Sequence, residues 1–552
     1  MEIKQAYELW KEKTVDNAEL SADLSGISEE EIFDRFYCEL EFGTAGLRGV
    51  LGAGTNRMNI YTVARASAGI AAYLLSGGDK KRRSVAIAYD SRNNSELFAK
   101  TSAAVYAGAG IKVFLYPYLM PTPALSYAVR NLGCDAGVVI TASHNPAKYN
   151  GYKAYGPDGC QITEEAADKI LAEIAKASYF APIADFDALL ASGDIEYISD
   201  EIIGGFIADA VACAKSPREG ARDLKLVYTP LNGAGRMCVT KALDMCGFTD
   251  VTLVSEQTEP DGNFPTCPYP NPEIREALQL GLDLMQKTGA DLLLATDPDC
   301  DRVGTAVLHN GEYVLITGNQ IGALLVDFVL SHKKDVLNEK STLVKTIVTS
   351  EVGADIARSY GLHIVDTLTG FKYIGEQIGK YEVNGDKEFV IGYEESYGYL
   401  VGTHARDKDA VVSSMLICQM AAYHKNNGRT LIDALNNIYA KFGFYLDALD
   451  TFVLKGKDGA EKIQSIMTNM RENGQSLFDN IKNVLDYSKG IDDLPKENVL
   501  KYTFTDGSWM AVRPSGTEPK LKVYYSMCGE TREAATEKLE KVRAILKKEI
   551  EA

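Results

Sequence analysis

The sequence lacks the features of a membrane protein and of a nucleic-acid-binding protein. No apolar run reaches the ~18 residues that a membrane-spanning helix needs, and the polar start MEIKQAYELWKEK is unlike a secretory signal peptide. Positive charge is in deficit: 58 Lys and Arg against 76 Asp and Glu give a formal charge of −18. The bulk surface should therefore repel nucleic acid and anionic membranes, and we expect a cytoplasmic protein that binds neither.

Cysteine pairs with metal-ligand spacing are also missing. The ten cysteines are scattered and include no C-x-x-C pair, which argues against cysteine-bound zinc and favours reduced thiols in the cytoplasm. Two phosphate-binding signatures are absent as well, namely a P-loop of the form G-x-x-x-x-G-K-[ST] and a strand-linked G-x-G-x-x-G. A nucleotide is therefore not the expected ligand.

What the sequence does contain is a repeated alternation of strand-like and helix-like segments over 552 residues, a length that suggests about three to five domains. The predicted buried strands are short, rich in Val, Ile and Leu, and end at polar residues or Gly and Pro. They are Ser84–Tyr89, Ala136–Thr141, Lys225–Thr229, Asp291–Thr296, Thr342–Val348 and Glu388–Tyr393. Amphipathic helices such as Glu273–Thr288 lie between them, which predicts α/β domains with largely parallel sheets.

The pattern changes after about residue 440. Helical segments are followed there by strands predicted at Tyr502–Phe504, Trp509–Val512 and Leu521–Ser526, and then by a charged C-terminal helix. This order predicts a smaller α+β domain. Earlier in the chain, five prolines within Pro260–Pro272 predict a stiff, ordered loop inside a domain rather than a flexible linker.

Chemically capable residues follow several of the predicted strands, where ligands collect in open parallel sheets. The first group is Thr141-Ala142-Ser143-His144-Asn145-Pro146, which puts a hydroxyl on a tight turn that could act as a nucleophile or carry a phosphate. An ordinary polar turn is the alternative. We expect no Ser-His-Asp hydrolase, because adjacent Ser143 and His144 do not normally bring the imidazole onto the neighbouring hydroxyl. His144 is more credible as a hydrogen-bond donor to a phosphate.

The second group is Asp297-Pro298-Asp299-Cys300-Asp301-Arg302. Alternating residues are expected to put three carboxylates on one side of an extended loop, where their repulsion favours a bound cation. Oxygen-only ligands favour a hard ion such as Mg²⁺. An EF-hand is excluded by Arg302 and Leu308 at its sixth and twelfth positions. A solvated acidic turn is the alternative.

Two further groups are suited to sugar hydroxyls and to phosphate. Gly392-Tyr393-Glu394-Glu395-Ser396-Tyr397-Gly398 offers paired carboxylates and a hydroxyl, with a helix N-cap or an exposed turn as the alternative. Arg513-Pro514-Ser515-Gly516-Thr517-Glu518-Pro519-Lys520 lets cations, hydroxyls and backbone N–H groups converge on a dianion, with a plain hairpin loop as the alternative.

Several basic residues lie in glycine-rich or turn segments, and each could be a solvated surface charge or part of one positive cleft. They are Arg48, Lys153, Lys372, Arg406 and Lys408. A net charge of −18 makes such a local cluster necessary for any phosphorylated substrate.

These motifs, in this order, resemble the α-D-phosphohexomutase superfamily, and most of all its long phosphoglucomutase/phosphopentomutase branch. The resemblance extends from Gly43–Gly49 (GTAGLRG) to the segment Arg513–Lys520 and so covers essentially the whole chain. It implies three related α/β domains with mixed, largely parallel sheets plus a smaller C-terminal α+β domain around a central cleft. We expect the domains at residues 1–205, 206–315, 316–440 and 441–552, carrying the phosphoserine, metal, sugar-binding and phosphate-binding loops respectively.

The same resemblance implies a role for each candidate residue. Ser143 would be the phosphoserine, and Asp297, Asp299 and Asp301 would bind one Mg²⁺ per chain together with a phosphoserine oxygen. The residues expected near the reacting phosphoryl group are Arg48, His144, Lys153, Arg302 and Lys408, with Lys153 or Lys408 as candidates for proton transfer. The residues expected to bind substrate are Glu394, Ser396, Lys372, Arg406, Arg513, Ser515, Gly516, Thr517 and Lys520.

The implied function is a phosphohexomutase, an intramolecular phosphotransferase that interconverts glucose 1-phosphate and glucose 6-phosphate. Glucose 1,6-bisphosphate would be the intermediate and activator, and sugar phosphates would be the small-molecule partners. Phosphopentomutase, phosphomannomutase and sugar-bisphosphate synthase activities stay open, as does a non-enzymatic phosphosugar-binding protein. A phosphatase fits less well, because a hydrolase needs only one phosphate site. The oligomeric state is left open.

Overall fold

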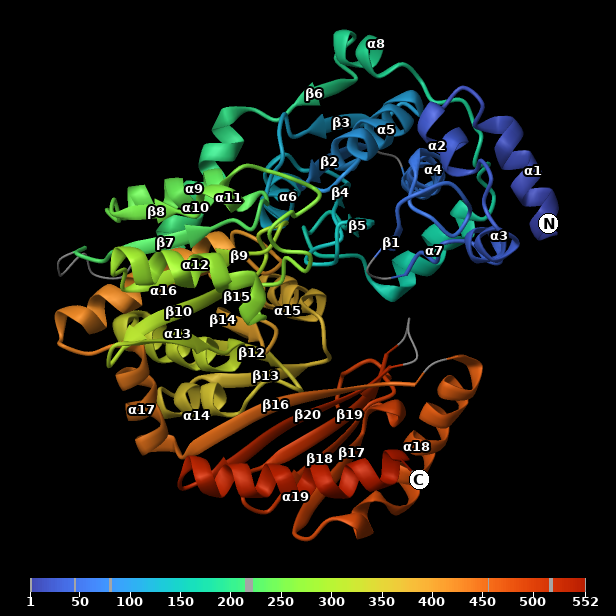
Figure 1. Cartoon of the computed structure of the whole chain (residues 1–552). Coiled ribbons are helices and arrows are strands. Elements are labelled where there is room, and N and C mark those ends of the chain that lie inside the picture. Colours follow the sequence, from blue (N-terminus) through green and yellow to red (C-terminus); the bar gives the residue numbers. More distant parts are fainter. Residues whose placement is uncertain are drawn as a thin grey trace. The chain divides into compact units, whose positions relative to one another are not determined.

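The computed structural model describes residues 2–43, 46–78, 82–213, 222–454, 456–515 and 520–551. The helices and strands are labelled in Figure 1. The chain divides into two compact units. The first comprises Met1–Ile316, Gly375–Gly385 and Tyr397–Tyr423, and the second comprises Thr317–Ile374, Asp386–Ser396 and His424–Ala552. No helix among the described residues is both long enough and apolar enough to cross a membrane.

The first sheet of the first unit has six strands in the order β1-β5-β4-β2-β3-β6. Their bounds are β1 Leu47–Val50, β2 Ser84–Tyr89, β3 Lys112–Leu115, β4 Ala136–Ile140, β5 Tyr149–Tyr155 and β6 Ile195–Tyr197. Strands β4, β2, β3 and β6 run parallel, whereas β1 and β5 pair antiparallel at one end of the sheet. The accompanying helices are α4 Ile60–Ser76, α5 Ser95–Gly108, α6 Thr122–Asn131, α7 Glu164–Ile174, α8 Phe186–Ala191 and α9 Asp200–Cys213.

Both faces of this sheet are covered, which explains why its central strands read as continuous apolar runs. Alternate residues of β2, beginning with Val85 and Ile87, join one core cluster with residues of α4, α5 and α7. A Cβ added to Gly137 of β4 would meet Val129 and Leu125, which belong to α6. Since side chains alternate along a strand, α6 packs on the opposite face.

Three short helices begin the chain: α1 Ile3–Lys13, α2 Ala18–Asp23 and α3 Glu29–Phe36. Asn17 and Ser28 cap α2 and α3 by accepting hydrogen bonds from backbone N–H groups of the first turn. Trp10 is almost fully buried and makes edge-to-face contacts with Phe36 and Tyr61. This aromatic cluster attaches the N-terminal helices to the first sheet domain.

The second sheet of the first unit has five strands in the order β11-β10-β9-β7-β8. Their bounds are β7 Leu226–Thr229, β8 Val251–Leu253, β9 Leu292–Thr296, β10 Val303–His309 and β11 Glu312–Ile316. The helices are α10 Gly235–Met245, α11 Ser255–Thr258 and α12 Arg275–Thr288, and strand β15 (Gly398–Val401) also belongs to this unit. Strands β7, β8 and β9 are parallel, so β7 and β9 present their carboxyl ends at the same edge.

The second unit begins with a parallel α/β segment. Strands β12 (Ser341–Thr346), β13 (His363–Thr367) and β14 (Glu388–Glu394) pair in parallel around β12. Helices α13 (Gly318–His332), α14 (Val352–Ser359) and α17 (Leu431–Phe442) belong to this unit, with a 3₁₀ turn at Lys334–Val336. Most of α15 (Phe371–Asn384) and of α16 (Ala410–Asn426) belongs to the first unit.

An antiparallel sheet follows, in the order β16-β20-β19-β18-β17. Its strands are β16 Phe444–Val453, β17 Ile481–Asp486, β18 Leu500–Phe504, β19 Trp509–Pro514 and β20 Lys520–Gly529. Helix α19 (Arg532–Glu551) lies along this sheet and contacts β16 and β20, and α18 (Gly456–Leu477) contacts β17 and β20 (Figure 1). A 3₁₀ turn spans Tyr487–Lys489.

The predicted fold class is confirmed, with three α/β domains of mixed sheets and a C-terminal domain of antiparallel strands and helices. The predicted strand Ser84–Tyr89 matches β2 at both ends. The strand prediction Thr342–Val348 was too long by two residues, because β12 ends at Thr346 and the chain then turns. Three others were too long by one residue, namely Ala136–Thr141, Lys225–Thr229 and Asp291–Thr296. The four domain boundaries and the central cleft stay predictions.

Candidate active site

Ser143 lies in a tight turn directly after β4. Its backbone φ is 53°, in the left-handed region that a non-glycine residue occupies only when its surroundings hold it there. The Ser143 N–H donates to Thr141 Oγ1 at 2.8 Å, and the Thr141 hydroxyl donates to the buried carboxylate of Asp90 at 2.6 Å. The hydroxyl of Ser143 donates to Asp297 Oδ2 at 3.0 Å. Buried polar contacts therefore fix the turn and aim the serine at the acidic loop.

Arg92 holds the serine turn in place, and no sequence motif had singled it out. Its buried guanidinium donates to four backbone carbonyls of the serine loop, those of Ser143, Asn145, Pro146 and Tyr149. Its Nε also lies 3.5 Å from the Asp90 carboxylate. The arrangement uses the fixed fork of donors that only arginine has, so we infer that Arg92 positions Ser143.

We predict that Arg92→Lys lowers kcat by about 10- to 100-fold and lowers the unfolding temperature, because an ammonium cannot reach all four carbonyls at once. Carbonyls left buried without a donor would each cost about 1–3 kcal/mol. Steady-state kinetics and a thermal melt measure the two effects.

Arg82→Lys is the matched control, since Arg82 pairs with Asp194 in the same domain but both side chains are exposed. We expect that variant to behave as wild type. Equal effects from the two substitutions would contradict the role given to Arg92.

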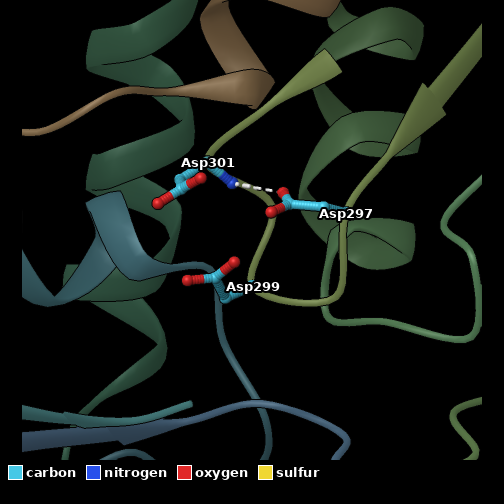
Figure 2. A group of neighbouring side chains, drawn as sticks. All are labelled: Asp297, Asp299 and Asp301. Carbon is cyan, nitrogen blue, oxygen red and sulfur yellow. Dashed lines mark hydrogen bonds between the residues drawn. The ribbon is translucent and has the colours of Figure 1, made fainter. Parts of the chain in front are cut away.

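Three aspartates lie on the loop between β9 and β10, and all three are buried. One ligand atom from each of Asp297, Asp299 and Asp301 can be chosen so that all lie within 4.8 Å of one another (Figure 2). The prediction that an extended loop brings them together was wrong. Cys300 has φ of 51° and its N–H donates to the Asp297 carbonyl at 2.9 Å, so a tight turn gathers the carboxylates.

Two lysines and a threonine surround the aspartates. Lys153 Nζ lies 2.8 Å from Asp299 Oδ2 and 3.5 Å from Asp301 Oδ2. Lys408 Nζ lies 3.2 Å from Asp301 Oδ2. The Thr122 hydroxyl donates to Asp299 Oδ2 at 2.9 Å. The predicted nucleophile, the acidic triad and both candidate proton-transfer lysines therefore belong to one buried cluster in the first unit.

The pKa values of Asp297 and Asp299 are shifted in opposite directions. Burial and the neighbouring charges of Asp299 and Asp301 raise the pKa of Asp297 well above its usual range. Burial also acts to raise the pKa of Asp299, but the charge and hydrogen bond of Lys153 outweigh it and hold that pKa below its usual range. Burial would lower the pKa of Lys153, yet Asp299 and Asp301 raise it. Lys153 is therefore primarily a cationic partner.

The triad fits a metal ion. Oδ1 of Asp299 and Oδ1 of Asp301 are buried and accept no hydrogen bond within the part of the chain that the structure describes. Buried carboxylate oxygens without donors are costly unless a cation compensates them. Oxygen-only ligands suit a hard cation such as Mg²⁺ better than a soft one.

One expectation about His144 was wrong, whereas its role as a hydrogen-bond donor to a phosphate stays a prediction. Its Nδ1 lies 3.1 Å from Ser143 Oγ, so the expectation that adjacent residues would not bring imidazole onto the hydroxyl was wrong. The left-handed turn at Ser143 makes this contact possible. Burial, together with the positive charges of Arg302 and Arg48, lowers the pKa of His144 well below its usual value. A neutral His144 can donate one hydrogen bond but carries no charge.

Arg48 and Arg302 supply positive charge at the same cluster. Arg48 lies on β1 opposite Gly151 of β5 and is exposed at the surface. Desolvation by the surrounding protein lowers the pKa of its guanidinium, and the charges of Asp299 and Asp301 oppose that shift. Arg302 donates to Glu273, and its Nε lies 3.8 Å from Asp301 Oδ1. An exposed guanidinium at the edge of a buried anionic cluster is available to a substrate phosphate.

The Gly392–Gly398 segment contributes to both units. Glu394, the last residue of β14, accepts a hydrogen bond from the Gly370 N–H at 3.0 Å. This contact places Glu394 beside the segment that carries Lys372, at the start of α15 in the second unit. Ser396 is partly exposed. In the first unit, a Cβ at Gly398 would lie 2.1 Å from the Lys408 side chain, so glycine there makes room for that lysine.

The predicted phosphate loop joins β19 to β20 in the second unit. Arg513 Nε donates to Glu497 Oε1 at 2.7 Å. The Ser515 N–H donates to the Lys520 carbonyl at 2.8 Å, so the two ends of the loop lie together. Gly516 and Thr517 lie outside the described residues. Phosphate binding by this loop stays a prediction.

Arg406 is not positioned as expected for a substrate ligand. Only 1% of its surface is exposed, and its guanidinium pairs with Glu382 and donates to the Thr403 carbonyl. These contacts favour a structural role in the segment that carries Lys408. The neighbouring Asp407 accepts from Tyr155 at 2.7 Å and lies 3.0 Å from Lys408 Nζ. Asp407 thus orients Lys408, and the sequence did not single it out.

Family comparisons agree with this arrangement. Four domain families match consecutive parts of the chain. They are phosphoglucomutase/phosphomannomutase alpha/beta/alpha domain I at residues 39–180, domain II at 205–311, domain III at 317–442 and the C-terminal domain at 457–545. The chain belongs to the phosphoglucomutase/phosphomannomutase family. The predicted membership in the α-D-phosphohexomutase superfamily is therefore confirmed.

Relatives match along most of this family member. A phosphoglucomutase of Staphylococcus saprophyticus is 35% identical over 536 residues, covering 93% of this chain and 95% of the relative. A phosphoglucomutase of Staphylococcus haemolyticus is 36% identical over 507 residues, covering 89% and 91%. Among solved structures, the open form of the Paramecium phosphoprotein pp63/parafusin, a phosphoglucomutase, superposes with a TM-score of 0.73 at 18% identity, covering 92% and 95%. That likeness supports the fold.

Proposed function

We propose that this protein is a phosphoglucomutase that interconverts glucose 1-phosphate and glucose 6-phosphate through a phosphoserine at Ser143. The observation that carries the proposal is the hydrogen bond of 3.0 Å from the Ser143 hydroxyl to Asp297, which joins a strained serine turn to a buried acidic triad and two buried lysines. Relatives 35–36% identical over most of the chain carry that name, which favours glucose phosphates as substrates.

Transfer would begin with the phosphorylated form of Ser143. A free hydroxyl of the sugar monophosphate attacks phosphorus, a new O–P bond forms, and the bond from phosphorus to Ser143 Oγ breaks. The product is glucose 1,6-bisphosphate, which turns over and returns its other phosphoryl group to Ser143. Positioning and charge stabilisation supply most of the acceleration in such transfers.

The acidic triad would hold one Mg²⁺ with a phosphoserine oxygen, and the bound cation would neutralise charge that develops on the transferring phosphoryl group. Lys153 and Lys408 keep the triad compact through their contacts with Asp299 and Asp301. Arg48 and Arg302 add positive charge for the phosphate oxygens, and His144 adds a neutral donor. Either lysine is a candidate to exchange the proton of the attacking hydroxyl once substrate binding changes its surroundings.

The second unit would bind the part of the substrate that does not react. Glu394 and Ser396 suit adjacent sugar hydroxyls, with Lys372 beside them on α15. The segment from Arg513 to Lys520, including Ser515, Gly516 and Thr517, suits the phosphate that is not being transferred. The bisphosphate must bind in both orientations. The mechanism therefore needs two separate phosphate sites, and sugar contacts that tolerate the change of orientation. We place the reaction in the cytoplasm, consistent with ten free cysteines.

A coupled assay of glucose 6-phosphate formation from glucose 1-phosphate, with Mg²⁺ and catalytic glucose 1,6-bisphosphate, tests the proposal. We expect rapid turnover that depends on the bisphosphate. Mannose 1-phosphate and ribose 1-phosphate serve as matched substrates. A higher kcat/KM for either one than for glucose 1-phosphate would make that sugar phosphate the preferred substrate. Release of inorganic phosphate or net accumulation of bisphosphate would instead indicate a phosphatase or a bisphosphate synthase. Binding of all three sugar phosphates without turnover would indicate a non-enzymatic binding protein.

A further inference from the structure

A second cluster of reactive groups lies in the first unit, apart from the acidic triad. Cys213, the last residue of α9, places its sulfur 3.4 Å from His404 Nδ1. The other ring nitrogen, His404 Nε2, lies 2.6 Å from Asp409 Oδ2. The side chains of His404 and Asp409 are 3% and 0% exposed, whereas Cys213 is partly exposed. The thiol of a partly exposed cysteine thus contacts an imidazole that a buried carboxylate orients.

The buried carboxylate determines which nitrogen of His404 carries the proton. Asp409 accepts a hydrogen bond from His404 Nε2–H, which leaves the lone pair of Nδ1 on the sulfur. Nδ1 can therefore accept the thiol proton and leave a thiolate beside an imidazolium. The hydrogen bonds and charges of Asp409 and Cys213 outweigh burial and raise the pKa of His404 to about 9. The C-terminal end of α9 opposes a thiolate, so the reactivity depends on direct contact with the imidazole.

The space around the sulfur is also specific. Gly402 has φ of +83°, and a Cβ there would lie 2.3 Å from Cys213 Sγ. The absence of a side chain at Gly402 is thus required for the sulfur to reach His404. Asp409 has a separate task, because its Oδ1 accepts hydrogen bonds from the Val411 and Val412 N–H groups at the start of α16.

We propose that Cys213 is a reactive thiol that hydroperoxides oxidise to a sulfenic acid, with His404 as its base and Asp409 as the residue that positions His404. The thiolate sulfur attacks one peroxide oxygen, an S–O bond forms and the O–O bond breaks. Sulfur loses two electrons and the peroxide gains them. The departing alkoxide, or hydroxide from hydrogen peroxide, takes the proton from His404 and leaves as an alcohol or water.

Oxidation of Cys213 also affects the segment that carries Lys408. An added oxygen on the sulfur would crowd Gly402. This residue directly precedes Thr403, whose carbonyl accepts a hydrogen bond from Arg406, so residues 402–408 would be displaced. Lys408 would then lose its contact of 3.2 Å with Asp301. This consequence rests on the proposed mutase function, and we expect oxidised protein to lose about tenfold in kcat.

The first test measures chemistry and needs no enzyme activity. Intact wild-type protein is treated with limiting iodoacetamide or with hydrogen peroxide plus dimedone, and each cysteine is followed by peptide mass spectrometry. The half-buried Cys38, Cys246 and Cys528 are the internal comparison. We expect Cys213 to be modified at least ~10-fold faster than these three. A rate for Cys213 equal to or below theirs would overturn the proposal.

Asp409→Asn and His404→Gln test the positioning. Asparagine keeps its single oxygen to cap α16 and turns an NH₂ group toward His404 Nε2, which favours the tautomer with the proton on Nδ1. Cys213 should therefore react about tenfold more slowly while the protein stays folded. An unchanged rate in a folded Asp409→Asn variant would overturn the role of Asp409. Modification at the wild-type rate in His404→Gln would overturn the role of the imidazole.

The Cys213→Ser variant tests whether oxidation of Cys213 is what lowers mutase turnover. We expect this variant to keep wild-type mutase turnover and to resist peroxide, whereas wild-type turnover should fall in step with Cys213 oxidation. Equal loss in both proteins would locate the sensitive group elsewhere and overturn the coupling. Because modification is measured by mass, a protein without mutase activity would still test the reactive thiol.

Discussion

Ser143→Ala should abolish phosphoryl transfer, with kcat for glucose 1-phosphate falling by at least ~10⁴-fold. Alanine removes the oxygen that would accept the phosphoryl group. The contacts of His144 and Asp297 in this turn are both made with that same oxygen, so neither residue replaces it. Substrate affinity should change little, since the phosphate and sugar contacts proposed in the second unit remain. Coupled kinetics for turnover and calorimetry for binding measure the two effects.

Ser102→Ala is the control for this result. Ser102 is as buried as Ser143, but its hydroxyl donates to the Phe98 carbonyl one turn earlier in α5 and lies outside the acidic cluster. We expect that variant to keep its turnover. Wild-type protein incubated with bisphosphate should also gain the mass of one phosphoryl group on the peptide that contains Ser143, and Ser143→Ala should not. Turnover that survives in Ser143→Ala would exclude the phosphoserine mechanism.

The fold was largely predictable because its central strands are buried on both faces. A short apolar segment such as Ser84–Tyr89 predicts a buried strand when polar residues follow it and amphipathic helices lie between it and the next such segment. Strand ends were less predictable, as the early end of β12 shows, because Ile347 and Val348 are apolar but lie in a turn. Their burial comes from tertiary packing against Trp509 and Tyr524, which no local pattern reports.

The candidate site, like the fold, was predictable where local sequence determines it and was not where long-range contacts do. Ser143 and the three aspartates stand in short motifs, so local sequence and a family resemblance both pointed to them. Arg92 and Asp407 act over distances of about 50 and 250 residues along the chain, and a lone arginine or aspartate in a turn gives no sign of such contacts. The contact of His144 with Ser143 and the gathering of the triad both depend on left-handed backbone at Ser143 and Cys300. Since neither residue is glycine, the sequence could not predict that geometry.

Asp297→Asn and Asp299→Asn should both remove metal binding and turnover, yet change the stability of the metal-free protein in opposite directions. Either substitution deletes one charge from a three-carboxylate site, so we expect kcat to fall by at least ~10³-fold and the rise in melting temperature on adding Mg²⁺ to disappear. The melting temperature in chelator separates the two variants, because the two carboxylates have opposite electrostatic surroundings in the folded chain.

For Asp297 the sign follows from proton binding. Its pKa is raised in the folded protein by burial and by Asp299 and Asp301, so the folded chain binds more protons than the unfolded chain above the ordinary carboxyl value. The free energy of unfolding of the metal-free protein therefore falls as the pH rises above the ordinary carboxyl pKa. This loss of stability is already present at neutral pH. Asparagine removes this loss of stability because it carries no charge. It also keeps an oxygen for the N–H groups of Asp301 and Arg302, which in the wild type donate to Asp297 Oδ1 at 3.0 Å. Asp297→Asn should melt a few degrees higher than wild type in chelator.

For Asp299 the sign reverses. Its pKa is depressed because Lys153, only 7% exposed, lies 2.8 Å away, so the pair stabilises the fold at neutral pH and loses that contribution as the pH falls. Asp299→Asn leaves the ammonium with Asp301 alone, at 3.5 Å, and should cost about 1–3 kcal/mol of metal-free stability. Melts in chelator and in Mg²⁺ for wild type and both variants give the result. Shifts of the same sign in chelator would contradict the charge distribution, and a persisting Mg²⁺ shift in either variant would place the metal elsewhere.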